Sequence, residues 1–346
     1  MPQEPTLGHR ATITLDRTGP GLVMPPFRFA LLSALLLALA PTVTHAQSYP
    51  SKPIRLVVPF GPGGPTDVAA RVVSQVVQSG IGQSVVIENR PGAGGATGTK
   101  SVASADPDGY TMLIGTSATL GVVPALVKNP GYDPVKSFAA VAKISDSTTV
   151  LVVPPGFPPN SVQELVAYAK ANPGRLSYAS AGHGNQTQLA AELLLARAGI
   201  TAVHVPYKSG AEMVTAVLSE QVQMTFPDIS ILLPLIQEKK IKALAVTGAR
   251  RHPQLPDVPT MAESGIADYV TTFWTGVIVP AGTPPDIVNK LNAAINDGLK
   301  SQLVQDSLGK VGAQPAPGSP QDFGNFIADE TRKWSAIAQT AGLSPQ

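Results

Sequence analysis

The sequence predicts an α/β protein with crossover connections between its strands. Short β-branched, apolar runs alternate with segments whose apolar residues recur every three or four positions. The length of 346 residues favours two domains. Hydrophobic residues make up 43% of the chain and charged residues 14%, which is enough apolar material for a large core and excludes a disordered protein.

Charge and residue types exclude further classes. The formal net charge is +2 and no long basic run occurs, so the chain is not built to hold a nucleic-acid backbone. The sequence has no cysteine, which excludes disulfides, thiolate metal sites and a cysteine nucleophile. Its 32 glycines and 34 prolines gather at the ends of predicted strands, which indicates special loops rather than a low-complexity linker.

Residues 1–46 are typical of an export leader. Residues 27–40 are apolar but too short to span a bilayer comfortably, and Thr44-His45-Ala46 follows as a cleavage site with suitable small residues. We therefore predict translation from Met24, a signal peptide cleaved after Ala46, and a mature protein in the periplasm. A cysteine-free exported chain is compatible with that compartment.

Nine short apolar runs predict strands in the mature chain. Their continuous apolar character suits strands that are buried on both faces, as in parallel sheets. These runs are 54–59, 84–88, 111–115, 150–153, 176–179, 202–205, 222–226, 243–247 and 276–279.

Helical patterns lie between the predicted strands. Valines recur every four residues over 68–76, and a leucine-rich stripe over 189–196 is followed by Gly199, which is expected to end its helix. Ser209 and Glu212 form a capping box that begins a third helix.

Two extended stretches, 138–153 and 271–280, are expected to link two lobes. If both cross between the lobes, the first lobe contains the beginning and the end of the mature chain. The predicted division is then one lobe from 47–143 and 275–346, and a second lobe from 144–274.

Three glycine-rich turns each stand between a predicted strand and a helix, at 59–67, 88–98 and 177–185. Glycine lets backbone N–H groups face a ligand without a Cβ in the way, and a helix N-terminus adds unpaired donors and partial positive charge. Thr66 can cap the first of these helices and can also offer a hydroxyl to the ligand. Because such loops gather at the carboxyl ends of the strands, we predict an anion held between the lobes.

Familiar catalytic and cofactor motifs fail in this sequence. The dinucleotide pattern G-x-G-x-x-G fails at Thr66 and at Thr97, and no P-loop occurs before Lys100. The nucleophile elbow around Ser180 fails because Tyr178 stands where glycine is needed. The histidines that remain after cleavage have no metal-pair spacing. We therefore predict no catalytic residue, no metal and no cofactor.

Several single residues fit both a binding and a structural interpretation. His204 lies in a predicted strand and is interpreted as a satisfied core histidine. His183 lies in the third turn and fits either a site or a structural role, and Asp228 fits either a ligand contact or a helix cap. Phe60 and Tyr207 stand at strand ends, where they either wall a pocket or simply pack.

Colinear motifs cover the chain from Tyr49 to the C-terminus. They are PFGPGG at 59–64, ENRPGAGG at 88–95, DGYT at 108–111, SAG at 180–182, HVPYK at 204–208, LPDVPT at 255–260 and PAGTP at 280–284. With these motifs the chain resembles the Bug family of periplasmic solute receptors, the extracytoplasmic subunits of tripartite tricarboxylate transporters. The number of blocks in the same order makes the resemblance specific.

The resemblance implies a two-lobed periplasmic binding protein (type II) fold that closes on one ligand in a cleft between the lobes. It implies small carboxylate ligands: di- and tricarboxylates, acidic or amide amino acids, and nicotinate-like or aromatic acids. Backbone N–H groups and hydroxyls of the loops would hold one carboxylate, with bridging waters. The ligand-binding residues carried over are Phe60, Gly61, Gly63, Gly64, Thr66, Gly95, Ala96, Thr97, Ser180, Ala181, His183, Asn185, Tyr207 and Asp228.

The sequence departs from the family pattern at the expected variable end of the ligand. The family commonly has Asn at the position of His183, and Ser/Thr-Pro-x-His where residues 185–188 read Asn-Gln-Thr-Gln. It usually has Asp-Asn where Pro227-Asp228 stands. The carboxylate seat is unaffected by these departures, but the sequence does not name the ligand.

The expected function is a receptor that captures a small organic carboxylate and delivers it to a membrane permease, as a monomer and with no nucleic-acid partner. A serine hydrolase is one alternative, because Ser180, Asp228 and His252 follow the chain order of an α/β-hydrolase triad, although the broken elbow at Tyr178 argues against it. A subunit that presents its ligand to a signalling partner is the other alternative.

Overall fold

The computed structural model describes residues 49–182, 185–340, 342–343 and 345. The predicted start at Met24, the cleavage after Ala46 and the site residue His183 therefore lie outside the described residues. Within those residues we find no helix whose length and hydropathy would let it cross a membrane.

Six strands form the first sheet, in the order β11-β4-β10-β3-β1-β2. The strand β1 runs parallel to both β2 and β3, whereas β10 is antiparallel to β3 and β4, and β11 is antiparallel to β4. The strands are β1 (Ile54–Val58), β2 (Val85–Asn89), β3 (Thr111–Thr116), β4 (Phe138–Thr148), β10 (Thr272–Pro280) and β11 (Ala313–Pro315).

Five strands form the second sheet, in the order β7-β6-β8-β5-β9. Here β6 is parallel to β7 and β8, and β5 is antiparallel to β8 and β9. The strands are β5 (Val150–Val153), β6 (Ser177–Ser180), β7 (Val203–Pro206), β8 (Met224–Thr225) and β9 (Lys242–Val246).

The predicted strand positions are confirmed, with differences in length and direction. Each of the nine runs overlaps a strand, although only two residues of 222–226 form β8. The runs 150–153, 243–247 and 276–279 belong to strands that pair with their neighbouring strands only in the antiparallel sense, so the expectation that all were parallel is wrong for these three. A continuous apolar run indicates that a strand is buried on both faces, but it does not indicate the direction of its neighbours. The strands β5 and β10 are buried in this way although they pair in the antiparallel sense.

Helices lie between the strands, as the alternating pattern predicts. Two short irregular turns, η1 (Ala93–Gly95) and η2 (Ala118–Val122), precede α3 and α4. The α-helices are α2 (Pro65–Ile81), α3 (Ala96–Ala103), α4 (Val123–Leu126), α5 (Val162–Ala171), α6 (Gln186–Ala198), α7 (Gly210–Leu218), α8 (Ile229–Gln237), α9 (Pro285–Leu299), α10 (Gln302–Gly309) and α11 (Pro320–Thr340).

The helix boundaries test three sequence expectations. Gly199 ends α6 in the left-handed conformation, and the Ser209 hydroxyl accepts a hydrogen bond from the Glu212 N–H at the start of α7, as predicted. The expectation that Thr66 caps α2 is wrong. The N-cap is Gly64, without a side-chain bond, because Pro65 already begins the helix and places Thr66 inside its first turn.

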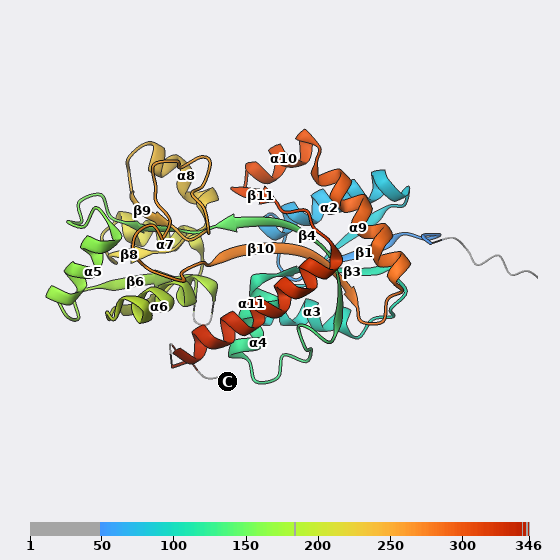
Figure 1. The fold of residues 1–346 in the computed structure, drawn as a ribbon, viewed down its shortest axis with the longest axis horizontal. Helices are drawn as coiled ribbons and strands as arrows, with labels where there is room; N and C mark the ends of the chain where they lie inside the picture. Colours follow the sequence, from blue (N-terminus) through green and yellow to red (C-terminus); the bar gives the residue numbers. More distant parts are fainter. Residues whose placement is uncertain (1–48, 183–184, 341, 344, 346) are drawn as a thin grey trace, which may run out of the picture. The chain divides into compact units, whose positions relative to one another are not determined.

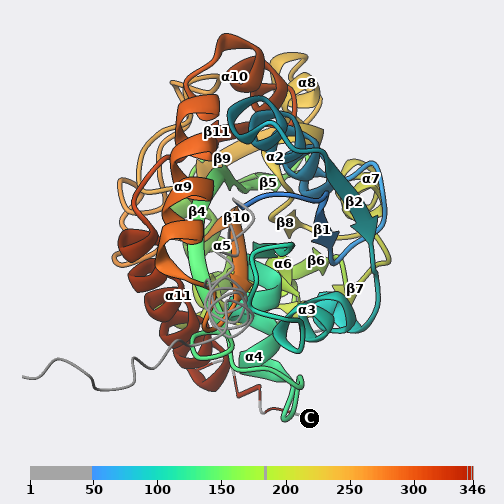
Figure 2. The ribbon, with the colours of Figure 1, turned by 90° about the vertical axis from the view of Figure 1, so that its right-hand side faces the viewer.

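Helices cover both faces of the first sheet (Figure 2). Alternate residues of β1, such as Leu56, pack with α2, α9 and α10 in one hydrophobic cluster, and Val57 packs with residues of α3 and α11 in another. Successive side chains of the strand point to opposite faces of the sheet, so neighbouring residues belong to different hydrophobic clusters.

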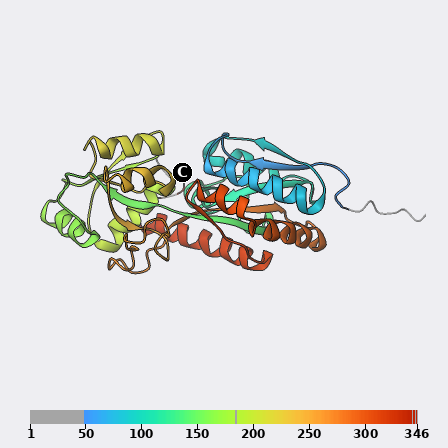
Figure 3. The ribbon, with the colours of Figure 1, turned by 90° about the horizontal axis from the view of Figure 1, so that it is seen from above.

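Three elements connect the two sheets. The antiparallel pair β4 and β10 runs from the first sheet toward the second, and only Thr149 separates β4 from β5 (Figure 1). Both stretches that were expected to link the halves are thus extended strands. The C-terminal helix α11 contacts β4 as well as α6, and Figure 3 shows it passing from the elements of the first sheet to those of the second.

Candidate functional site

The carboxyl ends of β1, β2 and β3 form one edge of the first sheet, because the three strands are parallel. The segments 59–67, 90–95 and 117–122 follow these ends directly. We call this the first edge. It contains two of the three predicted glycine-rich turns and, in addition, η2, which sequence reasoning did not single out.

The three segments of the first edge meet at Gly95. A Cβ added to Gly95 would lie 2.6 Å from Thr119 Cγ2 and 3.1 Å from Phe60 Cζ, and Gly95 has a φ of +95°. Both the close approach and the left-handed backbone require glycine here. The structure therefore brings the predicted residues Phe60 and Gly95 together and adds Thr119 as their neighbour.

Asp67 fastens the first glycine turn. Its Oδ2 accepts the Gly63 N–H at 3.1 Å and the Arg71 Nε–H at 3.0 Å, and its Oδ1 accepts from Asn89 Nδ2 at 3.3 Å. Burial acts to raise the pKa of Asp67, but these donors outweigh it and lower the pKa. The Gly63 amide is therefore already occupied by an ionised side chain of the protein.

The remaining predicted residues of the first edge differ in access. A Cβ at Gly61 or at Gly64 would meet no heavy atom within 4 Å, so both face open space. Thr66 and Ala96 are buried, whereas Thr97 is exposed on the first turn of α3.

The carboxyl ends of β6, β7 and β8 form a corresponding edge of the second sheet, which we call the second edge. It carries the described part of the third predicted turn after Ser180, and Tyr207 and Asp228 stand after its other two strands. The Tyr207 N–H donates to the Ser180 carbonyl at 2.8 Å. All predicted residues of the second lobe that the structure describes thus lie at one edge.

Ser180 is held within the protein. Its fully buried hydroxyl donates to the Gly182 carbonyl at 2.8 Å and lies 2.6 Å from His204 Nε2. The His204 ring stacks on Tyr178 with centroids 4.8 Å apart. The interpretation of His204 as a satisfied histidine is confirmed, but the side chain is only half-buried because β7 is an edge strand.

Asn185 closes the third turn as the N-cap of α6. Its Oδ1 accepts the Thr187 N–H at 2.9 Å and the Gln188 N–H at 3.2 Å. The Thr187 hydroxyl in turn accepts the Ala181 N–H at 3.0 Å. The loop is therefore tied to the first turn of the helix that follows it.

A hydrogen bond joins the first edge to the second edge. The Ser117 hydroxyl, directly after β3, donates to Gln186 Oε1 at 2.6 Å, and both residues are buried. Gln186 is the first residue of α6, next to the capping Asn185. Sequence reasoning missed both partners, because their contact is between residues 69 positions apart in the chain.

Asp228 is a helix cap. Its Oδ1 accepts the Ser230 N–H at 2.9 Å at the start of α8, and its Oδ2 accepts from the Ser147 hydroxyl of β4 at 2.6 Å. Burial raises the pKa of Asp228, although both hydrogen bonds and the nearby His252 oppose the increase. Of the two readings from the sequence, the cap is confirmed.

Ser180, Asp228 and His252, the triad of the alternative hydrolase hypothesis, are not joined by the contacts described here. His252 interacts with Asp228, but the histidine beside Ser180 is His204. Among the residues that the structure describes, we also find no group of three or more His, Asp or Glu side chains that would suit a metal ion.

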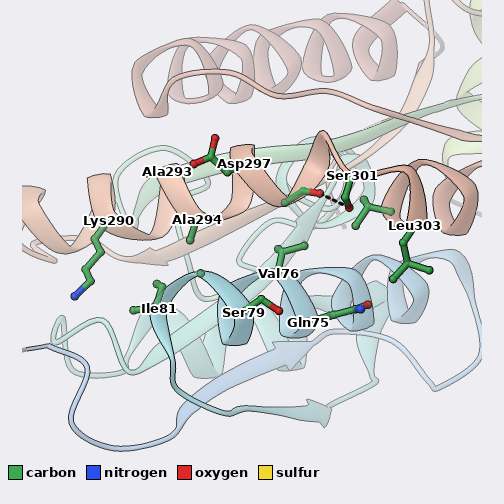
Figure 4. A pocket seen from close by; sticks show the side chains of 13 residues that line it. Gln75, Val76, Ser79, Ile81, Lys290, Ala293, Ala294, Asp297, Ser301 and Leu303 are labelled. Carbon is green, nitrogen blue, oxygen red and sulfur yellow. Dashed lines mark hydrogen bonds between the residues drawn. The ribbon is translucent and has the colours of Figure 1, made fainter.

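Two cavities are not lined by residues of the glycine turns, and the second borders Asp228 through Ser147. One, of about 520 Å³, lies between α2, α9 and α10 and is lined by Lys290, Asp297 and Leu303 among others (Figure 4). Another, of about 430 Å³, is lined by Asp146 and Ser147 of β4 and by His252. None of the predicted binding residues lines either cavity.

Comparison with known proteins shows a family that extends over most of the chain. Residues 69–343 match the model of the tripartite tricarboxylate transporter family receptor. The chain is 37% identical over 298 residues to protein BugT of Bordetella pertussis, and the match covers 86% of this chain and 91% of BugT.

Solved structures of similar proteins also match most of the chain. A structure described as R. palustris Rpa4515 with adipate has a TM-score of 0.75 and 36% identity, and the match covers 86% of this chain and all (100%) of that one. The periplasmic binding protein BugD has a TM-score of 0.72 and 35% identity, with coverage of 86% and 100%.

Proposed function

Because this chain belongs to the receptor family of tripartite tricarboxylate transporters, we propose that it captures a small organic carboxylate between its two edges for uptake by such a transporter. The fold predicted from the sequence, a two-lobed periplasmic binding protein, is confirmed by the similarity to BugD and by the two sheets. The family model describes a receptor, and BugD is described as a periplasmic binding protein.

One observation carries the location of the site. The Ser117–Gln186 hydrogen bond joins the first edge to the second edge, and the predicted loops of both lobes flank it. In open α/β sheets, ligands bind beyond the carboxyl ends of the strands. The contact therefore supports a binding site between the edges, with the lobes being 47–143 with 275–346, and 144–274.

The seat that we propose acts through uncharged donors. The N-termini of α2 and α6 lie at opposite edges and each offers partial positive charge to an anion, although the Thr187 and Gln188 N–H groups of α6 already donate to Asn185. The Gly63 N–H already donates to the Asp67 carboxylate. Gly61 and Gly64 are the other glycines of the first turn, and an added Cβ at either would face open space. Hinge motion along β4 and β10 would close the lobes on the ligand. The proposed contacts are the residues carried over from the family, His183 included.

The proposed function also includes the location of the protein, its oligomeric state and its membrane partners. The mature chain would begin after Ala46 in the periplasm, act as a monomer and deliver its ligand to membrane permease subunits. The adipate in the structure of R. palustris Rpa4515 supports a carboxylate as the ligand class.

A thermal-shift screen of the purified mature protein against organic acids tests the proposal. A ligand that binds the folded state raises the unfolding temperature in proportion to the logarithm of its occupancy term. We expect at least one di- or tricarboxylate to raise it, and neutral amides of the same acids to have no effect. A screen in which no organic acid raises the unfolding temperature would contradict the proposal.

Gly64→Ala tests where the seat lies. Gly64 has a φ of −85° and open space at its Cβ, so alanine fits the fold and places a methyl group beside the N-terminus of α2. We expect affinity for every bound carboxylate to fall about tenfold, the equivalent of one lost hydrogen bond, in calorimetric titration. Gly309→Ala in α10, which also has open space, is the matched control and should leave affinity unchanged. Equal affinities for both variants would place the seat elsewhere.

A further inference from the structure

Gln186 has a hydrogen-bonding group that the protein leaves unused. The side chain is only 8% exposed, and its Oε1 accepts the Ser117 hydroxyl. Its amide nitrogen Nε2 is buried and has no hydrogen-bond partner among the residues that the structure describes. A buried amide donor without a partner loses its hydrogen bonds to water and gains none in return, so natural proteins rarely keep one without a reason.

The acceptors closest in sequence to Gln186 are already engaged. Asn185 Oδ1 accepts the Thr187 and Gln188 amides at the start of α6, and the Thr187 hydroxyl donates to the same oxygen. The Ser117 hydroxyl is used as the donor to Gln186 Oε1 and thereby fixes the plane of the amide. The missing acceptor is therefore expected to come from outside the chain.

We propose that Gln186 Nε2 donates to a second acceptor group of the ligand and makes Gln186 the residue that selects dicarboxylates over monocarboxylates. This inference rests on the proposed function, in which the glycine turns of the first edge hold the first carboxylate. Gln186 stands at the second edge, as the first residue of α6, and its side chain contacts Ser117 of the first edge. A neutral donor bonded to a carboxylate forms a charge-assisted hydrogen bond, which is stronger than a neutral pair.

Ser117 is a positioning residue in this scheme. Its hydroxyl takes the Oε1 lone pair and so orients Nε2 toward the ligand, without contact between Ser117 and the ligand. Ser117→Ala should reduce the preference for dicarboxylates, and Ser117→Thr, which keeps the hydroxyl, should restore it. A structural role alone would lower the affinities for dicarboxylates and monocarboxylates by the same factor.

The experiment compares acids of equal chain length with one or two carboxylates. Calorimetric titrations use succinate against butyrate, glutarate against pentanoate, and adipate against hexanoate. Wild-type protein should bind the preferred dicarboxylate at least about tenfold more tightly than its monocarboxylate, as one charge-assisted hydrogen bond implies. Gln186→Glu replaces the donor with a repelling charge and should remove that preference, while affinity for the monocarboxylate changes less than about threefold.

Two further variants keep the test decisive. Gln186→Leu removes the donor without adding charge and should also remove the preference. Gln163→Glu on the exposed face of α5 makes the same charge change in the second lobe and should keep it. A preserved preference in both Gln186 variants, or a wild-type protein that binds monocarboxylates equally well, would overturn the inference and leave the proposed function intact. Wild-type protein that binds no acid would overturn both.

Discussion

Asp67 and Asp228 both lie at the start of a helix, and their surroundings shift their pKa values in opposite directions. At Asp67, donors from Gly63, Asn89 and Arg71 outweigh burial and lower the pKa. At Asp228, burial outweighs the donors and raises the pKa. Asp67 lies inside the first turn of α2 and Asp228 is the N-cap of α8, so the balance between burial and hydrogen-bond donors decides the direction of each pKa shift.

His252 gives a prediction for the stability at acidic pH. Burial lowers its pKa below the ordinary 6.5, although the charge of Asp228 opposes this. As the pH falls below the unfolded value, the unfolded chain takes up the proton first, so the free energy of unfolding decreases. Urea unfolding at about pH 7.5 and about pH 5.5 should show this decrease, and His252→Gln should reduce it. An identical decrease in the variant would contradict the assignment.

The packing of α2 against α9 depends on one glycine in each helix, Gly80 in α2 and Gly298 in α9. A Cβ at Gly298 of α9 would lie 2.3 Å from Val76 of α2, and one at Gly80 would lie 2.9 Å from Ala294. The two helices border the cavity of Figure 4, where Val76 and Ala294 are labelled. Small residues at two successive turns thus let the helix backbones approach closely.

Gly298→Ala should therefore destabilise the protein. The added methyl group overlaps Val76, and overpacking of this kind typically costs about 1–3 kcal/mol of unfolding free energy. The matched control is Gly309→Ala, also in a helix, where the added Cβ meets nothing and helix propensity improves. Urea denaturation should separate the two variants. Equal midpoints would show that α2 and α9 can move apart without cost.

The two tryptophans of the chain couple the two halves of the molecule through Glu330 of α11. Trp274 lies in a core cluster of the first sheet, and Trp334 packs in a cluster that includes Leu151 and other residues of the second sheet. Both indole N–H groups donate to Glu330 Oε2 at 3.0 Å, and Lys333 pairs with the other carboxylate oxygen.

Glu330→Ala should lower the stability of the whole molecule. It leaves two buried indole donors without an acceptor, at a cost of about 2–4 kcal/mol, whereas Glu330→Gln keeps an acceptor oxygen and should cost less. Trp274 and Trp334 are the only tryptophans in the sequence, so the fluorescence change on urea unfolding reports on this contact directly. Similar unfolding midpoints for the two variants would argue against a structural role for the carboxylate.

At the scale of the whole molecule, local patterns predicted the strand positions, the glycine turns and the family motifs. The strand at 150–153 was predicted at the correct position, because its four consecutive buried residues are all apolar in the sequence. Its antiparallel direction was not predicted. The direction depends on which strands lie next to this run in the second sheet, and the sequence does not show that. Thr66 was wrongly expected to cap α2 because Pro65 begins the helix one position earlier.

The sequence by itself determined the α/β class and the three loops that are suited to an anion, because periodicity and glycine positions act over a few residues. Only the tertiary structure decided that Thr119 closes on Gly95, that Asp67 takes the Gly63 amide, and that Ser117 reaches Gln186. These contacts join segments that come together only when two sheets are built, and side-chain hydrogen bonds depend on distances of a few tenths of an ångström. A linear pattern carries no information at that precision.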